Sequence, residues 1–190
     1  GDNLMAAYLF KNFTQNYPVS KHTEECAYMS AYCYYLEAPD FSLDASNNYK
    51  AIKELQAFVN KFPDSEKVGK CNELLDELRA TLSKKAFENA KQYFVTENYK
   101  SAIKALENVL IDFPSSINRE EAHYLIVKSS YLLAINSIRT KVVDRLKATL
   151  DAYEQFKDNY ETSEYLKDLE NTYKKTNQTL TELKQRQDEI

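Results

Sequence analysis

The stretch Phe58–Ser65, FVNKFPDS, decides the fold of this chain because the same phrase occurs four times along it. Each copy has an apolar residue, an aromatic residue four positions later, and a serine three positions beyond that; Pro follows the aromatic in three copies. The other copies are residues 13–20, 109–116 and 156–163, so the second aromatics lie 45, 51 and 47 residues apart. A period of this length is typical of stacked helical hairpins, which usually bind other molecules rather than transform them.

The composition favours an all-α fold. The 190 residues include only 2 Gly and 4 Pro, whereas sheets and phosphate-binding loops need Gly-rich turns. Hydrophobic residues make up 43% of the chain, which is enough for a core. The net charge of −4 argues against nucleic acid as a partner and gives no support for electrostatic binding to anionic lipid. No apolar run is long enough to cross a bilayer.

About eight helices in antiparallel pairs are expected from the breakers and caps. Their predicted ranges are 4–16, 21–38, 48–61, 66–96, 99–113, 118–137, 141–159 and 163 to near the end. The range 66–96 is either one long helix or two helices with a subtle break. Residues 39–47 read as a loop inserted between two helices, and Asn47 or Asn48 can cap the helix after it. Thr162 or Ser163 can cap the last helix, and Asn118 an earlier one.

Small and aromatic residues follow a tetratricopeptide (TPR) spacing within the 34 residues from 83 to 116. The positions are Ala86, Ala90, Tyr93, Tyr99, Ala102, Leu106, Val109 and Pro114. We therefore expect one TPR-like, right-handed short solenoid over residues 1–190. Its predicted parts are a partial repeat 1–20, a repeat 21–65 with the insertion, a repeat 66–116 with a long first helix, a repeat 117–163, and a capping helix 164–190.

Catalytic and metal-binding motifs are missing from the sequence. Only Gly1 and Gly69 are glycines, so glycine-rich nucleotide loops cannot form. The two histidines and three cysteines lie in no ligand spacing, and the thiols Cys26, Cys33 and Cys71 are expected to be small buried hydrophobes. We expect no enzyme activity, no cofactor and no metal.

An aromatic, weakly cationic groove is the first candidate binding surface. The first helix of each TPR pair lines the concave face. With Ala31 and Ala90 at the helix contacts, the groove residues would be Tyr28, Tyr32, Tyr35, Lys84, Phe87, Lys91, Phe94, Tyr124 and Tyr131. Tyrosine offers a large contact area and a hydroxyl at low entropic cost, which suits peptide recognition. The alternative is that these aromatics fill the core of the solenoid.

The C-terminal helix is the second candidate surface. Leu166, Leu169, Tyr173, Thr176, Leu180 and Leu183 step by three and four residues, as in a heptad seam. The first half is expected to cap the last repeat, because terminal repeats need their apolar face covered. The second half, from Thr176 on, either frays or docks a partner.

The order and length of these features resemble the BamD family, the YfiO/ComL-type TPR lipoproteins of outer-membrane β-barrel assembly in Gram-negative bacteria. The resemblance rests on residues 49–65, the long helix after them, residues 86–103 and residues 112–116. It implies a non-enzymatic scaffold on the periplasmic face of the outer membrane. Its partners would be the POTRA region of BamA, other Bam subunits and the C-terminal signals of unfolded outer-membrane proteins.

The same resemblance implies an N-terminally truncated chain. The lipidated N-terminal Cys of the family and the first helix of the first repeat have no counterpart here, so membrane attachment is expected only through an anchor outside this chain. Two other readings stay open at this point. One is a generic TPR adaptor with another client, and the less favoured one is a TPR lipoprotein of glycan uptake, which would need longer insertions.

Overall fold

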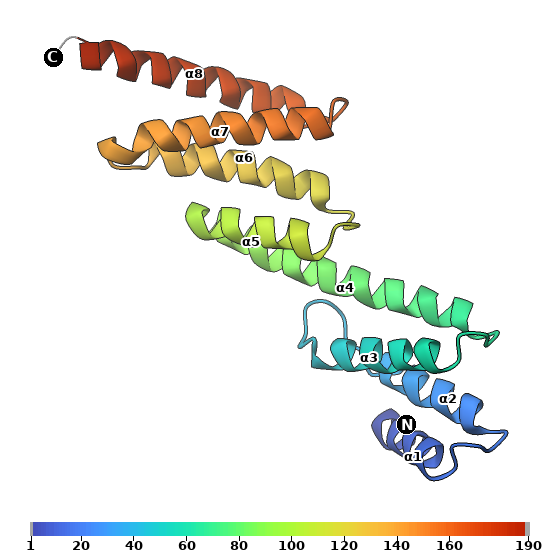
Figure 1. The fold of residues 1–190 in the computed structure, drawn as a ribbon. Coiled ribbons are helices and arrows are strands. Elements are labelled where there is room, and N and C mark those ends of the chain that lie inside the picture. Colours follow the sequence, from blue (N-terminus) through green and yellow to red (C-terminus); the bar gives the residue numbers. More distant parts are fainter. Residues whose placement is uncertain (1, 189–190) are drawn as a thin grey trace. The chain divides into compact units, whose positions relative to one another are not determined.

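The computed structural model describes residues 2–188 and folds into an all-α, TPR-like arrangement of eight helices with no strand in that range. The helices, shown in Figure 1, are α1 (Asn3–Asn16), α2 (Thr23–Leu36), α3 (Ser46–Lys61), α4 (Val68–Val95), α5 (Tyr99–Asp112), α6 (Arg119–Ile135), α7 (Arg139–Asn159) and α8 (Leu166–Asp188). The predicted helices are confirmed. Residues 66–96, which the sequence predicted as either one long helix or two, contain one helix, α4, of 28 residues.

Residue contacts divide the described chain into two compact units, with the boundary inside α4 between Lys85 and Ala86. The first unit contains α1–α3 and most of α4; its core centres on Leu55, Phe58 and Leu75. The second contains the end of α4 and α5–α8, with one core cluster around Phe87 and another around Phe156. The division into repeats predicted from the sequence stays a prediction.

The recurring sequence motif forms the same turn at all four places. The aromatic N–H donates to the carbonyl of the residue four positions earlier at 2.9–3.0 Å and so closes the helix. The following serine N–H then donates to the aromatic carbonyl at 3.0–3.2 Å. The serine Oγ accepts the N–H two residues further on, at 3.1–3.3 Å, from the residue directly before the next helix; the serines are Ser20, Ser65, Ser116 and Ser163. Asn118 stands at the predicted N-cap position of α6 but makes no side-chain cap hydrogen bond. A cap of the last helix by Thr162 or Ser163 stays a prediction.

The register behind each turn also repeats. Counted back from the second aromatic, the residues at eleven, seven and four positions before it are buried in α3, α5 and α7. They are Ala51, Leu55 and Phe58; Ala102, Leu106 and Val109; and Thr149, Tyr153 and Phe156. The small residue lets the two helices approach closely, and the larger residues fill the core beside it. Ala31 and Ala90, which we expected at helix contacts, are 1% and 2% exposed.

The insertion between α2 and α3 is fixed to α4 by Lys85. Its Nζ donates to the carbonyl oxygens of Phe41 at 3.0 Å and Leu43 at 2.6 Å. Neither of the asparagines predicted as caps has that role. Asn48 is buried and donates to the Pro39 carbonyl, and Asn47 donates to the Glu37 carbonyl. Both side chains therefore pair carbonyl groups at the start of the insertion, because buried carbonyls require hydrogen-bond partners.

Candidate binding surface

Three tyrosines on α2 form an ordered stack, which we call the tyrosine ladder: Tyr28, Tyr32 and Tyr35. The ring centroids of Tyr28 and Tyr32 lie 5.9 Å apart with planes 11° from parallel, and those of Tyr32 and Tyr35 lie 5.9 Å apart at 20°. All three side chains are half-buried. They pack on the core of the first unit, where Tyr28 meets the ring of Phe58 edge-on at 5.7 Å. The ladder therefore combines a fixed base with a surface that stays accessible.

Charged residues of α4 and its preceding turn hold both ends of the ladder. Tyr35 Oη donates to Glu77 Oε2 at 2.6 Å, and this hydrogen bond raises the pKa of Tyr35. At the other end Lys67 Nζ lies 4.9 Å from the centre of the Tyr28 ring and pairs with Glu25 at 2.8 Å. Such contacts reduce the rotamer freedom that the rings would lose on binding a ligand.

A cavity of about 330 Å³ opens beside Tyr35 at the end of the ladder. Its apolar wall is formed by the residues that lead into the insertion, and its polar rim carries the carboxylates of Asp40 and Glu77. The complete lining is Tyr35, Leu36, Ala38, Pro39, Asp40, Asn48, Glu77, Leu78 and Thr81. Sequence reasoning missed this cavity, because Glu77 lies 42 residues from Tyr35 and no local pattern joins them.

The other residues predicted for the groove are divided between the two units. Lys84 is exposed in the first unit and lies 4.0 Å from the centre of the Phe41 ring. Phe87 is only 1% exposed and belongs to the core of the second unit, so it has no surface to offer a ligand. Lys91 is engaged by Glu121 at 2.6 Å, a hydrogen bond that raises the pKa of Lys91. Phe94 is half-buried and meets Tyr99 edge-on at 6.0 Å.

Tyr124 is part of a network between α6 and α8. Its ring stacks on Tyr165 at 4.4 Å, and its Oη donates to Asp168 Oδ2 at 3.0 Å. Lys128 Nζ donates to the same oxygen at 2.9 Å, which lowers the pKa of Asp168. Burial, together with the hydrogen bond to Asp168, raises the pKa of Tyr124 to about 12. The network connects α8 to α6, and no local sequence pattern indicates it because its members lie some 40 residues apart.

Tyr131, the last predicted groove residue, is half-buried on α6 in the second unit. Among the residues predicted to line the groove, the three tyrosines on α2 stack on one another in the first unit. In the second unit Phe87 is buried, Lys91 is paired by charge, and Phe94 and Tyr124 contact neighbouring rings. The groove itself stays a prediction.

The seam of α8 is largely occupied. Leu166, Leu169 and Tyr173 pack against the core formed with α6 and α7, where the Tyr173 ring lies 4.6 Å from that of Tyr153. Thr176 is fully buried as well. Leu180 and Leu183 are half-exposed, so they are the part of the predicted docking helix that still offers apolar surface.

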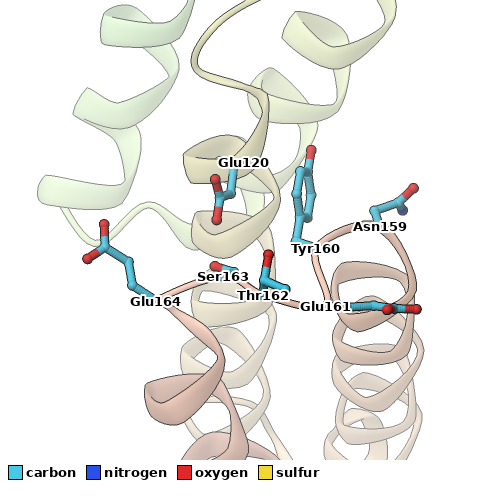
Figure 2. A pocket seen from close by; sticks show the side chains of 7 residues that line it. All are labelled: Glu120, Asn159, Tyr160, Glu161, Thr162, Ser163 and Glu164. Atoms are coloured by element: carbon cyan, nitrogen blue, oxygen red, sulfur yellow. The ribbon is translucent and has the colours of Figure 1, made fainter.

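A second cavity, of about 440 Å³, lies at the turn between α7 and α8. Figure 2 shows Glu120 on α6 beside the turn residues that complete the lining, which is Glu120, Asn159, Tyr160, Glu161, Thr162, Ser163 and Glu164. Three carboxylates and no cation line it, so an anionic ligand would be repelled.

The part of the chain that the structure describes holds no group of three or more His, Cys, Asp or Glu residues that could bind a metal ion. Within residues 2–188, no helix has both the length and the apolar character required to cross a bilayer. Cys33 and Cys71 are buried and Cys26 is half-buried; all three are free thiols whose pKa is raised by burial.

Paired helices, one recurring turn and small residues at the helix contacts define a TPR-like repeat protein of the kind that binds through its surface. The family model named YfiO and described as outer membrane lipoprotein matches residues 1–146. The chain therefore belongs to the YfiO family of outer membrane lipoproteins. None of the curated proteins matches it significantly.

Proposed function

We propose that this protein is a non-enzymatic scaffold of outer-membrane β-barrel assembly, located on the periplasmic face of the outer membrane. It binds the C-terminal signals of unfolded outer-membrane proteins through the tyrosine ladder and the POTRA region of BamA through its C-terminal helices. Membership of an outer membrane lipoprotein family supports the location. The ladder of Tyr28, Tyr32 and Tyr35 is the observation that carries the substrate part of the proposal.

The ladder suits an extended peptide with aromatic side chains. Two ring steps of 5.9 Å span roughly two turns of α2 and give a continuous aromatic strip, on which aromatic residues of a peptide can stack. The cavity beside Tyr35 can take one side chain at the end of that strip. Because the rings are already fixed by Phe58, Glu77 and Lys67, little side-chain entropy is lost on binding.

The test compares peptide binding by two tyrosine variants. Tyr32→Ala removes the central ring of the ladder, and we expect about tenfold weaker binding of a synthetic barrel C-terminal peptide, measured by fluorescence anisotropy. Tyr49→Ala is the matched control, because Tyr49 is exposed on α3 and lies outside the ladder. Equal affinity of the folded Tyr32→Ala variant and the parent would rule the ladder out as the peptide site.

The BamA contact is tested at the exposed part of α8. We expect Leu180→Asp with Leu183→Asp to abolish capture of the BamA periplasmic region, since charges would replace the remaining apolar surface. Thr181→Asp adds a charge on an exposed position of the same helix and serves as control. Intact capture by the double variant would exclude the second half of α8 as the contact.

A further inference from the structure

Two turns of the second unit expose apolar side chains at one end of its helices. Tyr93 and Val95 lie at the end of α4, directly before the turn to α5. Ile135 ends α6, and Ile138 lies in the turn between α6 and α7. Val95 is 63% and Ile138 67% exposed. Figure 1 shows both turns at the same end of the second unit, with the α5–α6 and α7–α8 turns at its opposite end.

Stacking of hairpins does not account for these side chains. Neighbouring hairpins cover the faces of a hairpin, whereas its two ends stay free of the stack. An aliphatic side chain at such an end gains no burial in the folded monomer and lowers solubility. Two adjacent turns with this character therefore indicate a surface that meets something apolar.

The charges around these side chains are mainly positive. Lys100 on α5 and Arg139 and Lys141 on α7 are all exposed. Glu97 and Asp144 are the exposed acids close to them in the sequence. We call this surface, made of Tyr93, Val95, Lys100, Ile135, Ile138, Arg139 and Lys141, the basic end.

The opposite end of the same unit has the reverse charge. Glu120, Glu161 and Glu164 line its cavity, and Ile117 beside them is 96% exposed. An exposed isoleucine thus occurs at both ends, but Ile117 lies beside a cluster of three carboxylates. The net charge of −4 is an average over the chain and hides this local difference.

We propose that the basic end rests on an anionic phospholipid surface. Val95, Ile135 and Ile138 enter the boundary between headgroups and acyl chains, and Tyr93 lies at the headgroup level, where amphipathic rings are favoured. Lys100, Arg139 and Lys141 stay at the level of the phosphates. Charge complementarity between the exposed cations and anionic headgroups favours a lipid surface as the occupant. The contact does not depend on peptide or BamA binding.

The experiment is a flotation assay of the 190-residue chain with vesicles of phosphatidylcholine, alone or mixed with phosphatidylglycerol. We expect binding only to the mixed vesicles, and loss of that binding at high salt. Replacing Arg139 and Lys141 by Gln should weaken it by roughly fivefold for each cation removed. Val95→Ser with Ile138→Ser should weaken it about tenfold while the cations remain.

Ile117→Ser is the matched control, since it removes an exposed isoleucine from the acidic end. Far-ultraviolet circular dichroism shows whether each variant is folded. The proposal is overturned if the parent does not float with the mixed vesicles, or if Ile117→Ser weakens binding as much as the basic-end variants. Binding of a polyglutamate peptide at the basic end without vesicle binding would also overturn it and would point to an acidic protein surface.

Discussion

Ser20, Ser65, Ser116 and Ser163 accept the same hydrogen bond at four turns, each from the N–H two residues further on. The short hydroxyl side chain gives that N–H a partner in the turn directly before each helix. One residue thus closes the turn, which explains why it stands at a fixed distance from the aromatic.

Ser163→Ala should lower the free energy of unfolding by about 1 kcal/mol, because the N–H of Tyr165 loses its acceptor. Urea unfolding followed by circular dichroism measures the change. Thr162→Ala, at the exposed neighbouring position, should change stability by no more than about 0.5 kcal/mol. Equal effects of the two substitutions would show that the hydrogen bond accepted by Ser163 does not contribute to the free energy of unfolding.

His123 should make the free energy of unfolding of the second unit depend on pH. Burial, with a smaller contribution from Arg119, lowers the pKa of His123, whose ring lies 5.6 Å from that of Tyr160. Below about pH 6.5, the ordinary pKa of histidine, this side chain therefore binds a proton more readily in the unfolded chain than in the folded chain. The free energy of unfolding should fall as the pH drops from about 7 to about 5.

His123→Gln should reduce this fall, as measured by urea unfolding at a series of pH values. His22→Gln, on an exposed histidine, should leave it in place. If the fall is the same in His123→Gln as in the parent, another group is responsible.

At the scale of elements, the insertion between α2 and α3 depends on α4 for its order. Lys85 contributes two hydrogen bonds to loop carbonyls, and Lys84 covers the ring of Phe41. Both lysines lie on the same turn of α4, so the helix that packs on the core also shapes the loop beside the ladder cavity.

Lys85→Met should make opening of the loop easier by about 1–2 kcal/mol, since both carbonyls lose a charged donor. Hydrogen exchange of the amides in residues 40–45 should then accelerate, while those of α3 stay protected. Lys84→Met should have a smaller effect, because it removes only a cation–ring contact. A larger effect of Lys84→Met would contradict this account.

The helices were predictable because their ends are encoded locally. Pro and the aromatic–serine spacing mark four turns, and Glu97–Asn98 marks another, where Glu97 adopts a left-handed φ of 60°. Caps at α3 and α6 were predicted less well, since Asn48 is drawn into the core and Asn118 makes no side-chain cap hydrogen bond. Local sequence does not indicate which of several polar residues will hydrogen-bond to a distant group instead of capping the adjacent helix.

The candidate surface was predictable only in part, and α4 shows why. Tyr28, Tyr32 and Tyr35 share one stripe of a short helix, so their mutual stacking follows from spacing. Phe87 also fits a groove position by spacing, yet it is buried. A helix that packs in two units changes the face that it buries along its length, and periodicity alone cannot locate that change.

At the scale of the whole molecule, each unit has a core of its own. Leu75 is fully buried in the first unit and Phe156 in the second. Repeat proteins derive their stability from contacts between neighbouring elements, so damage to one core need not spread along the chain.

Leu75→Ala should destabilise the first unit by about 2–5 kcal/mol by leaving a cavity. Native-state hydrogen exchange should then show faster exchange in α2 and α3, with α6–α8 still protected. Phe156→Ala should give the reverse pattern. Loss of protection throughout the chain in either variant would mean that the two units unfold as one.

The four equivalent turns bound the hairpins, so each hairpin begins and ends with the same local structure. A segment that begins after one aromatic–serine turn and ends at the next carries the same turn at both ends, because the hydrogen bonds of the turn lie within ten residues. Duplication of such a segment in a gene would add a hairpin with its turn already formed. The spacing of 45, 51 and 47 residues shows that the length between turns can vary while the turn itself stays the same.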